Sequence, residues 1–136
     1  MRELLYPLGV LAVSLLLIAV VVFGWDDRST LVAAPEAVTE NFARQIAARR
    51  FDLAMNQLAS ETRRSERPQT LAARFNGVLT GIGTVNHVEA DTNWMQKSQA
   101  AVRARIKGDR ATASFEVALV RENGLWRIEQ ISDLVR

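Results

Sequence analysis

The chain has 136 residues, no cysteine and a formal net charge of +2. This length leaves room for one small domain and one membrane segment. The lack of cysteine excludes a disulfide framework, a thiolate metal site and a lipid-modified cysteine. The net charge is too small to predict binding to nucleic acid. A folded domain in this chain must therefore rely on its hydrophobic core.

The first element is a run from Leu4 to Phe23 in which every residue except Tyr6 and Ser14 is apolar or small. About 20 such residues, folded as a helix, span the hydrocarbon core of a bilayer. Tyr6 and Trp25 lie near its two ends, where aromatic side chains mark the membrane interface. We expect residues 1–25 to form one N-terminal transmembrane helix that acts as an anchor, with a linker at 26–34.

A cleaved signal peptide is the alternative, because "LVAAPE" places Val32 and Ala34 at the spacing of a cleavage site. The apolar core of a signal peptide usually has about 7–15 residues, and this run is longer. Pro35 would also follow the cut, which is unfavourable for a peptidase. The sequence therefore favours an uncleaved anchor.

The charges that flank the apolar run indicate its orientation. Arg2 precedes the run, whereas Asp26, Asp27 and Arg28 follow it. Positive charge favours the cytoplasmic side. We expect a single-pass protein of the bacterial inner (cytoplasmic) membrane, with its N-terminus in the cytoplasm and its C-terminal domain in the periplasm.

Three helices are predicted next. The first begins at Pro35, which suits a first helical turn, and places Phe42 and Ile46 at helical spacing. The second, "DLAMNQLAS", has Asp52 as its candidate N-cap. "ETRRSERP" breaks the pattern and predicts a loop. The third helix runs from "PQTLAARF" to the glycines at 81 and 83.

From Thr84 onward the apolar period changes from 3.6 to 2, which predicts about four antiparallel strands. Asn123-Gly124 is a favoured two-residue hairpin turn. Ile131 departs from the alternation, which predicts a β-bulge near Glu129–Gln130. In the first strand Val88, Ala90 and Trp94 share one side, and Trp94 and Trp126 are expected as core or rim aromatics. The residues expected on the inner face of the later strands are Val102, Ala104, Ile106, Ala113, Phe115, Val117, Leu119, Trp126 and Ile128.

Helices followed by strands predict an α+β domain at residues 35–136, with about three helices packed on one face of the sheet. "AVTENFARQIAARRFDLAMNQLAS", "RPQTLAARF" and "ASFEVALVRENGLWRIEQI" resemble the opening helices, the third helix and the closing hairpin of the nuclear-transport-factor-2-like superfamily, also called cystatin-like or SnoaL-like. The resemblance covers about residues 35–135. It implies a cone-shaped domain whose bent sheet encloses an apolar cavity.

That superfamily includes isomerases, cyclases, dehydratases, ligand binders and scaffold proteins, so the resemblance alone does not settle the function. Its ketosteroid-isomerase-like members need an Asp base and Tyr or acid donors inside the cone. The only tyrosine here is Tyr6, in the apolar run. The expected cavity-lining residues carry no ionisable group: Phe75, Val102, Ala104, Phe115, Val117 and Trp126. We therefore expect no catalytic residue and no cofactor.

His87, Glu89 and Asp91 share one face of a predicted strand and are residue types that bind divalent metals. Alternate residues on a strand lie about 6–7 Å apart, too far for one ion to reach all three. We interpret them as a solvated strand face and predict no metal site.

Two groups of basic residues are candidates for docking a partner. Arg63, Arg64 and Arg67 cluster between predicted helices, where an acidic partner surface or lipid headgroups would attract them. Arg103, Arg105 and Lys107 line one strand face, which is also consistent with ordinary solubility of the outer face or with protection of a sheet edge. A solvated loop is the alternative for the first group.

We expect a non-catalytic accessory or scaffold subunit whose partners are integral membrane proteins and the lipid bilayer. Candidate assemblies are a respiratory or photosynthetic electron-transfer complex and a secretion apparatus. The main alternative is a membrane-tethered module that binds a small apolar ligand in the cone. A membrane-tethered enzyme with isomerase- or cyclase-like activity in the cone is the third hypothesis.

Overall fold

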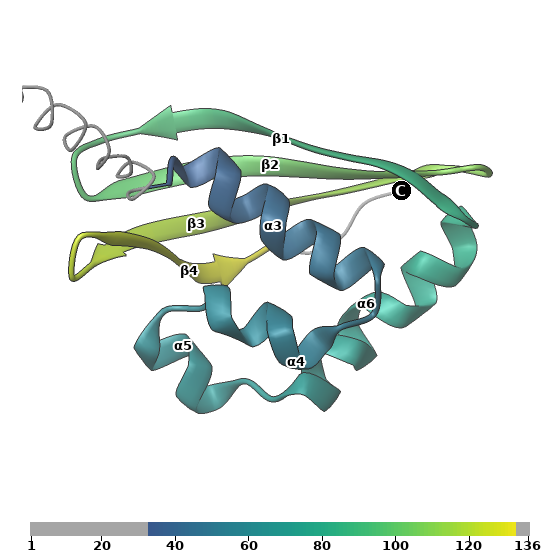
Figure 1. Cartoon of the computed structure of the whole chain (residues 1–136), viewed down its shortest axis with the longest axis horizontal. Coiled ribbons are helices and arrows are strands. Elements are labelled where there is room, and N and C mark those ends of the chain that lie inside the picture. Colours follow the sequence, from purple (N-terminus) through teal and green to yellow (C-terminus); the bar gives the residue numbers. More distant parts are fainter. Residues whose placement is uncertain (1–32, 133–136) are drawn as a thin grey trace, which may run out of the picture. The chain divides into compact units, whose positions relative to one another are not determined.

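The computed structural model describes residues 33–132 of the chain. The predicted transmembrane anchor, with Tyr6 and Trp25, lies outside the described residues, as does most of the linker. Within the described part, no helix is long and apolar enough to cross a membrane. Contacts divide the chain into two compact units, Met1–Ala33 and Ala34–Arg136. The second unit has the predicted α+β class, with helices followed by an antiparallel sheet (Figure 1).

Helices α3 and α6 supply most of the helical core. α3 (Pro35–Ala47) begins at a proline and buries Phe42, Ala43 and Ile46. α6 (Pro68–Ile82) also begins at a proline, and its buried residues recur every three or four positions: Leu71, Phe75, Leu79 and Ile82. Each helix therefore presents one apolar stripe to the sheet, as the helical spacing predicted.

The segment between these helices differs from the prediction. α4 (Phe51–Ala54) starts at Phe51 with Arg50 as its N-cap, so Asp52 lies in the first turn instead of capping it. The 3-10 helix η2 (Met55–Gln57) follows. The predicted loop is mostly helix α5 (Ser60–Ser65). None of the α5 residues is buried, so its sequence lacks the apolar periodicity that would have predicted it.

Four antiparallel strands lie in the order β1-β2-β3-β4: β1 (Val85–Met95), β2 (Gln99–Gly108), β3 (Thr112–Glu122) and β4 (Leu125–Ile131). Asn123 and Gly124 have φ values of 52° and 81°, as a type I′ turn requires, so the predicted hairpin is confirmed. Leu119 pairs with Ile128 and Ala118 with Gln130, which leaves Glu129 as the extra residue of the predicted bulge.

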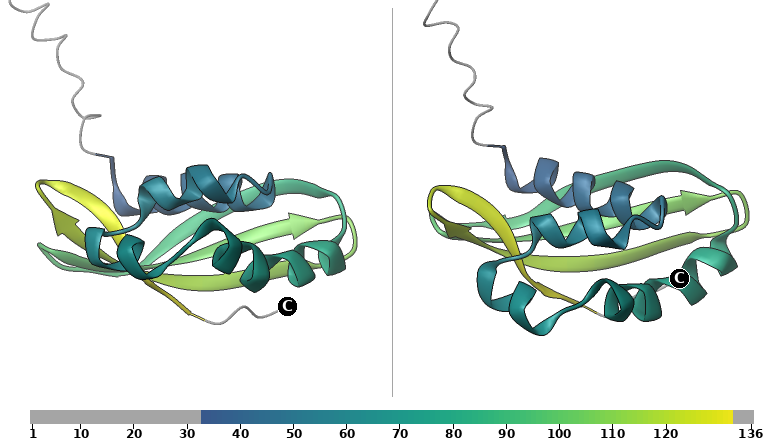
Figure 2. Two further views of the ribbon diagram at one scale, coloured as in Figure 1. Left: turned by 90° about the horizontal axis from the view of Figure 1, so that it is seen from below. Right: turned by 60° about the horizontal axis from the view of Figure 1, so that its bottom comes forward.

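One face of the sheet is buried against the helices and forms a single core cluster. At its centre the rings of Phe42, Phe75 and Phe115 pack edge to face, with centroids 5.3–6.4 Å apart. Figure 2 shows α3 running along the sheet in two further views. The inward positions predicted for β2, β3 and β4 are confirmed, because Val102, Ala104, Ile106, Ala113, Phe115, Val117, Leu119, Trp126 and Ile128 are all buried.

Trp94 is the exception, since 46% of its surface is exposed. Thr92 pairs with Val102 but Trp94 pairs with Ala101, so Asn93 is an extra residue in β1. This shift reverses the alternation and turns Trp94 away from the core face. The prediction that Trp94 shares a face with Val88 and Ala90 is therefore wrong.

The two ends of the sheet differ. At one end the β1–β2 and β3–β4 hairpins meet, and the Arg121 amide donates to the Ser98 carbonyl at 3.0 Å. We call residues 94–99 and 121–125 the hairpin end. At the other end the β2–β3 turn is hydrogen-bonded to the end of α6 and the residue that follows it. Arg110 N donates to Ile82 O at 2.9 Å, and Thr84 N donates to Asp109 Oδ1 at 3.1 Å.

Candidate functional site

Charged residues on neighbouring strands form a ladder of ion pairs centred on Glu89. Arg105 Nη1 lies 2.7 Å from Glu89 Oε2 and 3.2 Å from Asp91 Oδ2. Lys107 Nζ lies 3.7 Å and His87 Nε2 3.2 Å from Glu89 Oε1. The register explains these contacts, because Glu89 pairs with Arg105 across the two strands and His87 with Lys107. We call this group the β1–β2 ion ladder.

The ladder keeps its central groups ionised. The pKa of Glu89 is lowered from its ordinary value of 4.5, mainly by the hydrogen bond from Arg105. Desolvation, the next largest effect, opposes this, and the charge of Lys107 and the hydrogen bond with His87 lower the pKa further. The pKa of Arg105 is raised, mainly by the same hydrogen bond. Two of the three basic residues predicted on this face are therefore already paired inside the domain.

The ladder is not arranged as a metal site. Within residues 33–132, no group of three or more His, Asp or Glu side chains is placed to share an ion. His87 and Asp91 contact different partners, and the cations of Arg105 and Lys107 lie beside the carboxylates. Its side chains are partly exposed, as the interpretation of a solvated strand face expected.

Arg103 lies on the same strand but outside the ladder. Its backbone pairs with Asp91 on one side and with Glu116 on the other. The Glu116 carboxylate accepts a hydrogen bond from the Asn93 amide. Arg103 is exposed, and it is the member of the predicted β2 row whose charge is least engaged by the described residues.

Arg63, Arg64 and Arg67 form the second basic group, which we call the arginine cluster. Arg63 and Arg64 belong to α5, and Arg67 is the N-cap residue of α6. All three are exposed. Arg64 lies 3.5 Å from Glu61, in a pair that is itself exposed. Among the described residues, Arg63 and Arg67 have no ion pair or side-chain hydrogen bond.

Helix α5 holds this cluster at a fixed place beside β4. The Glu122 carboxylate accepts hydrogen bonds from Ser60 N at 3.0 Å and from Ser60 Oγ at 3.1 Å. Thr62 Oγ1 donates to the Glu129 carbonyl at 2.8 Å. These contacts join residues more than 60 positions apart. They give the arginines a defined location on the surface, which the sequence predicted only as a loop.

The six residues predicted to line a cavity all belong to the core cluster: Phe75, Val102, Ala104, Phe115, Val117 and Trp126. The rings of Phe75 and Phe115 pack against each other in this cluster, with centroids 5.3 Å apart. Arg121 stacks over the Trp126 ring, with its guanidinium carbon 5.1 Å from the centroid. That these residues surround a ligand cavity stays a prediction.

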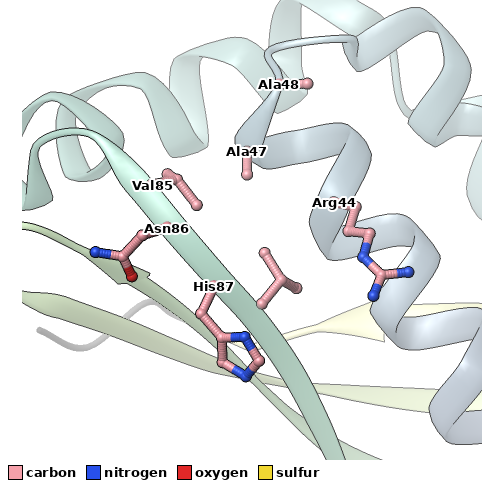
Figure 3. A pocket seen from close by; sticks show the side chains of 7 residues that line it. Arg44, Ala47, Ala48, Val85, Asn86 and His87 are labelled. Carbon is pink, nitrogen blue, oxygen red and sulfur yellow. The ribbon is translucent and has the colours of Figure 1, made fainter.

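An open groove of about 480 Å³ lies between the end of α3 and the start of β1 (Figure 3). Arg44, Ala47 and Ala48 form one side, and residues 85–88 form the other. Arg44 pairs with Glu40, one turn earlier on α3. The groove joins segments about 40 positions apart, so sequence reasoning did not find it.

A smaller hollow of about 150 Å³ lies where the β4 bulge meets β3. Its lining includes Glu116, Gln130 and Ser132. Ser132 Oγ accepts a hydrogen bond from Glu116 N at 2.8 Å, and Ser132 N donates to Glu116 O at 2.8 Å. These hydrogen bonds attach the residue that follows β4 to β3, so the polar groups of this hollow are used in the end of the sheet.

No family model matches the chain, and no curated protein matches it. Helices packed on an antiparallel sheet are compatible with the nuclear-transport-factor-2-like resemblance but do not identify it.

Proposed function

We propose that this chain is a membrane-anchored, non-catalytic accessory subunit that docks onto an integral membrane complex through the arginine cluster. The observation that carries the proposal is that Arg63 and Arg67 are exposed and have no ion pair among the described residues. Both are exposed on a surface that α5 fixes in place, and neither pairs with another described residue. An acidic surface on a partner would supply the missing counter-charges.

The arginine cluster is favoured over the β2 row because two of the three charges in the β2 row already form ion pairs inside the domain. Arg105 and Lys107 would have to give up Glu89 to bind a partner. Arg63 and Arg67 are exposed, so they would exchange only hydrogen bonds with water for contacts with the partner. Arginine suits such a contact, because its planar guanidinium forms paired hydrogen bonds to carboxylates and is enriched in protein interfaces.

The apolar run of residues 4–23 completes the proposal. A single-pass anchor in the inner membrane, with the domain in the periplasm, confines the cluster to one surface. Confinement raises the effective concentration of the domain beside a partner in the same membrane, so a modest contact is enough. A respiratory or photosynthetic electron-transfer complex and a secretion apparatus are the proposed hosts, and a nuclear-transport-factor-2-like fold would serve as the scaffold.

Co-purification in mild detergent tests this function. We expect the tagged full chain to retain integral membrane partners in fixed stoichiometry. Arg63→Glu and Arg67→Glu should each lower the retained partner, because each variant sets a carboxylate against an acidic surface. Arg50→Glu is the matched control, since Arg50 is exposed and has no side-chain partner among the described residues.

Two results would overturn the proposal. A wild-type chain that purifies as a lone monomer would remove the accessory role. Partner retention that falls equally in Arg50→Glu would show a general effect of charge and remove the assignment to the arginine cluster.

A further inference from the structure

Three large apolar side chains are exposed in the described part of the chain, and all three lie at the hairpin end. The exposed fractions are 46% for Trp94, 58% for Met95 and 40% for Leu125. The other large apolar side chains in this part are buried or half-buried. Exposed apolar residues scattered singly need no explanation, but a concentration at one end of a sheet indicates contact with another apolar phase.

The fold brings these residues together from two hairpins. Met95 pairs with Ala100 at the close of β1, and Leu125 pairs with Glu122 at the start of β4. The bond from Arg121 N to Ser98 O ties one hairpin to the other. Figure 1 shows both turns at the same end of the sheet. Trp94 pairs with Ala101 and Met95 with the buried Ala100, so these two neighbours point to opposite faces of the sheet. Leu125, next to the buried Trp126, points to the outer face, as Trp94 does. The three side chains therefore lie at the same end of the sheet, on both of its faces.

The first residues of the domain, at the start of α3, lie on the side of the hairpin end. The last turn of α3 lies against the first residues of β1, where Ala47 and Ala48 face Val85 and Val88 across the groove. α3 thus runs opposite to β1, and its first residue is directed toward the hairpin end. Figures 1 and 2 agree that α3 begins on the side of the hairpin turns.

The linker leaves little distance between this end and the apolar run. Ten residues, 24–33, separate Phe23 from Ala34. Fully extended, they reach at most about 35 Å. If residues 4–23 span a bilayer, Ala34 therefore lies within about 35 Å of it.

The chemistry of the hairpin end suits a lipid headgroup layer. Tryptophan is enriched at membrane interfaces because its ring is apolar and its indole N–H is polar. Lys97 lies in the turn directly after Met95, is exposed, and has no ion pair among the described residues. Its ammonium group can meet a lipid phosphate. The acidic Glu122 at this end is already engaged by Ser60.

We propose that the hairpin end is a lipid-contact site, in which Trp94, Met95 and Leu125 enter the interface of the bilayer that holds the anchor. This inference rests on the membrane anchoring in the proposed function, but not on any protein partner. Contact at this end would set the orientation of the domain on the membrane and so the direction in which the arginine cluster faces.

Site-directed spin labelling tests the site directly, because the chain has no cysteine of its own. Met95→Cys and Leu125→Cys place a nitroxide at the hairpin end, and Asn86→Cys places one at the exposed start of β1 as the control. Each full-length variant is reconstituted into vesicles of phosphatidylcholine and phosphatidylglycerol without any partner. Collisions are measured with oxygen, with a water-soluble nickel chelate and with a nickel-chelating lipid.

We expect labels at 95 and 125 to lose accessibility to the aqueous chelate and to gain collisions with oxygen and the nickel lipid, relative to the label at 86. Equal aqueous accessibility at all three positions would overturn the site. Loss of accessibility to all three relaxation agents would also overturn it, because it would show cover by a second copy or another protein.

Two further measurements separate this site from the proposed function. Flotation of the vesicles reports anchoring, and a chain that fails to float would overturn both proposals. In the same vesicles, a chain labelled at Lys97→Cys should show contact with lipid. Adding Trp94→Ser, Met95→Ser and Leu125→Ser to that chain should remove the lipid-contact signal while the protein still floats with the vesicles. If wild type contacts lipid yet retains no partner, the accessory role fails and the lipid site stands.

Discussion

Gly108 ends β2 beside the last residue of α6, whereas Gly77 lies within α6. The space around the first glycine is filled, and the space around the second is open. A Cβ added to Gly108 would lie 2.1 Å from the Ile82 carbonyl oxygen. A Cβ added to Gly77, which lies within α6, would meet no atom within 4 Å. The first glycine allows the β2–β3 turn to approach the helix backbone, whereas the second weakens a helix without any packing reason.

Alanine at these two positions should therefore change stability in opposite directions. Gly108→Ala should lower the free energy of unfolding by about 1–3 kcal/mol, because the added methyl group forces the turn away from Ile82. Gly77→Ala should raise it by about 0.5–1 kcal/mol through helix propensity. Urea unfolding of both variants measures the difference, and changes of the same sign would contradict this reading of the contact.

At the scale of elements, α5 depends on residues distant in the sequence. Its N-cap residue, Ala59, supplies no side-chain hydrogen bond. The Glu122 carboxylate takes that role by accepting from Ser60 N and Ser60 Oγ. A short helix without buried residues is held by such contacts more than by its own propensity.

Glu122→Ala should destabilise α5 by about 1 kcal/mol, the usual effect of losing a cap. Hydrogen exchange should then show faster exchange of the α5 amides, with the central strands unchanged. Glu129→Ala is the matched control, because Thr62 uses the carbonyl of Glu129 and not its side chain. If the two variants accelerate α5 exchange equally, Glu122 does not act as the cap.

The sequence predicted those elements in which apolar periodicity and turn residues coincide. The inward residues of β2 and β3, the Asn123-Gly124 turn and the bulge at Glu129 were all predicted from local pattern. α5 was missed because its position depends on Glu122. The exposure of Trp94 was missed because the extra residue Asn93 leaves no mark in the alternation of side chains.

The candidate sites were predictable only in part. Local spacing placed His87 and Glu89 on one face of one strand, and Arg105 and Lys107 on one face of the next strand. Which charges neutralise one another depends on the register between β1 and β2. That register pairs Arg105 and Lys107 with Glu89 and leaves Arg103 outside the ladder, and no local pattern could supply it.

At the scale of the whole molecule, the β1–β2 ion ladder makes stability depend on pH. Since the pKa of Glu89 is lowered by its partners, its contribution is present above 4.5 and is lost as pH falls through the lowered pKa. We expect Glu89→Gln to reduce the loss of stability between neutral pH and about pH 3.

Urea unfolding at both pH values measures this dependence. Glu129→Gln is the control, since its side chain is exposed and has no partner among the described residues. An identical acid response in wild type and Glu89→Gln would show that the ladder makes no difference to folding.

The two edges of the sheet bear on how the protein avoids aggregation. Leu58 forms a bridge with Ile128, and Ala59 N donates to Ile128 O, so part of the β4 edge is covered. Within residues 33–132, β1 has no strand on its outer side. Its two register shifts, at Asn86 and Asn93, interrupt the regular edge that another chain would need for pairing. Copies of the domain that meet at this edge would therefore find a poor template for growth into fibrils.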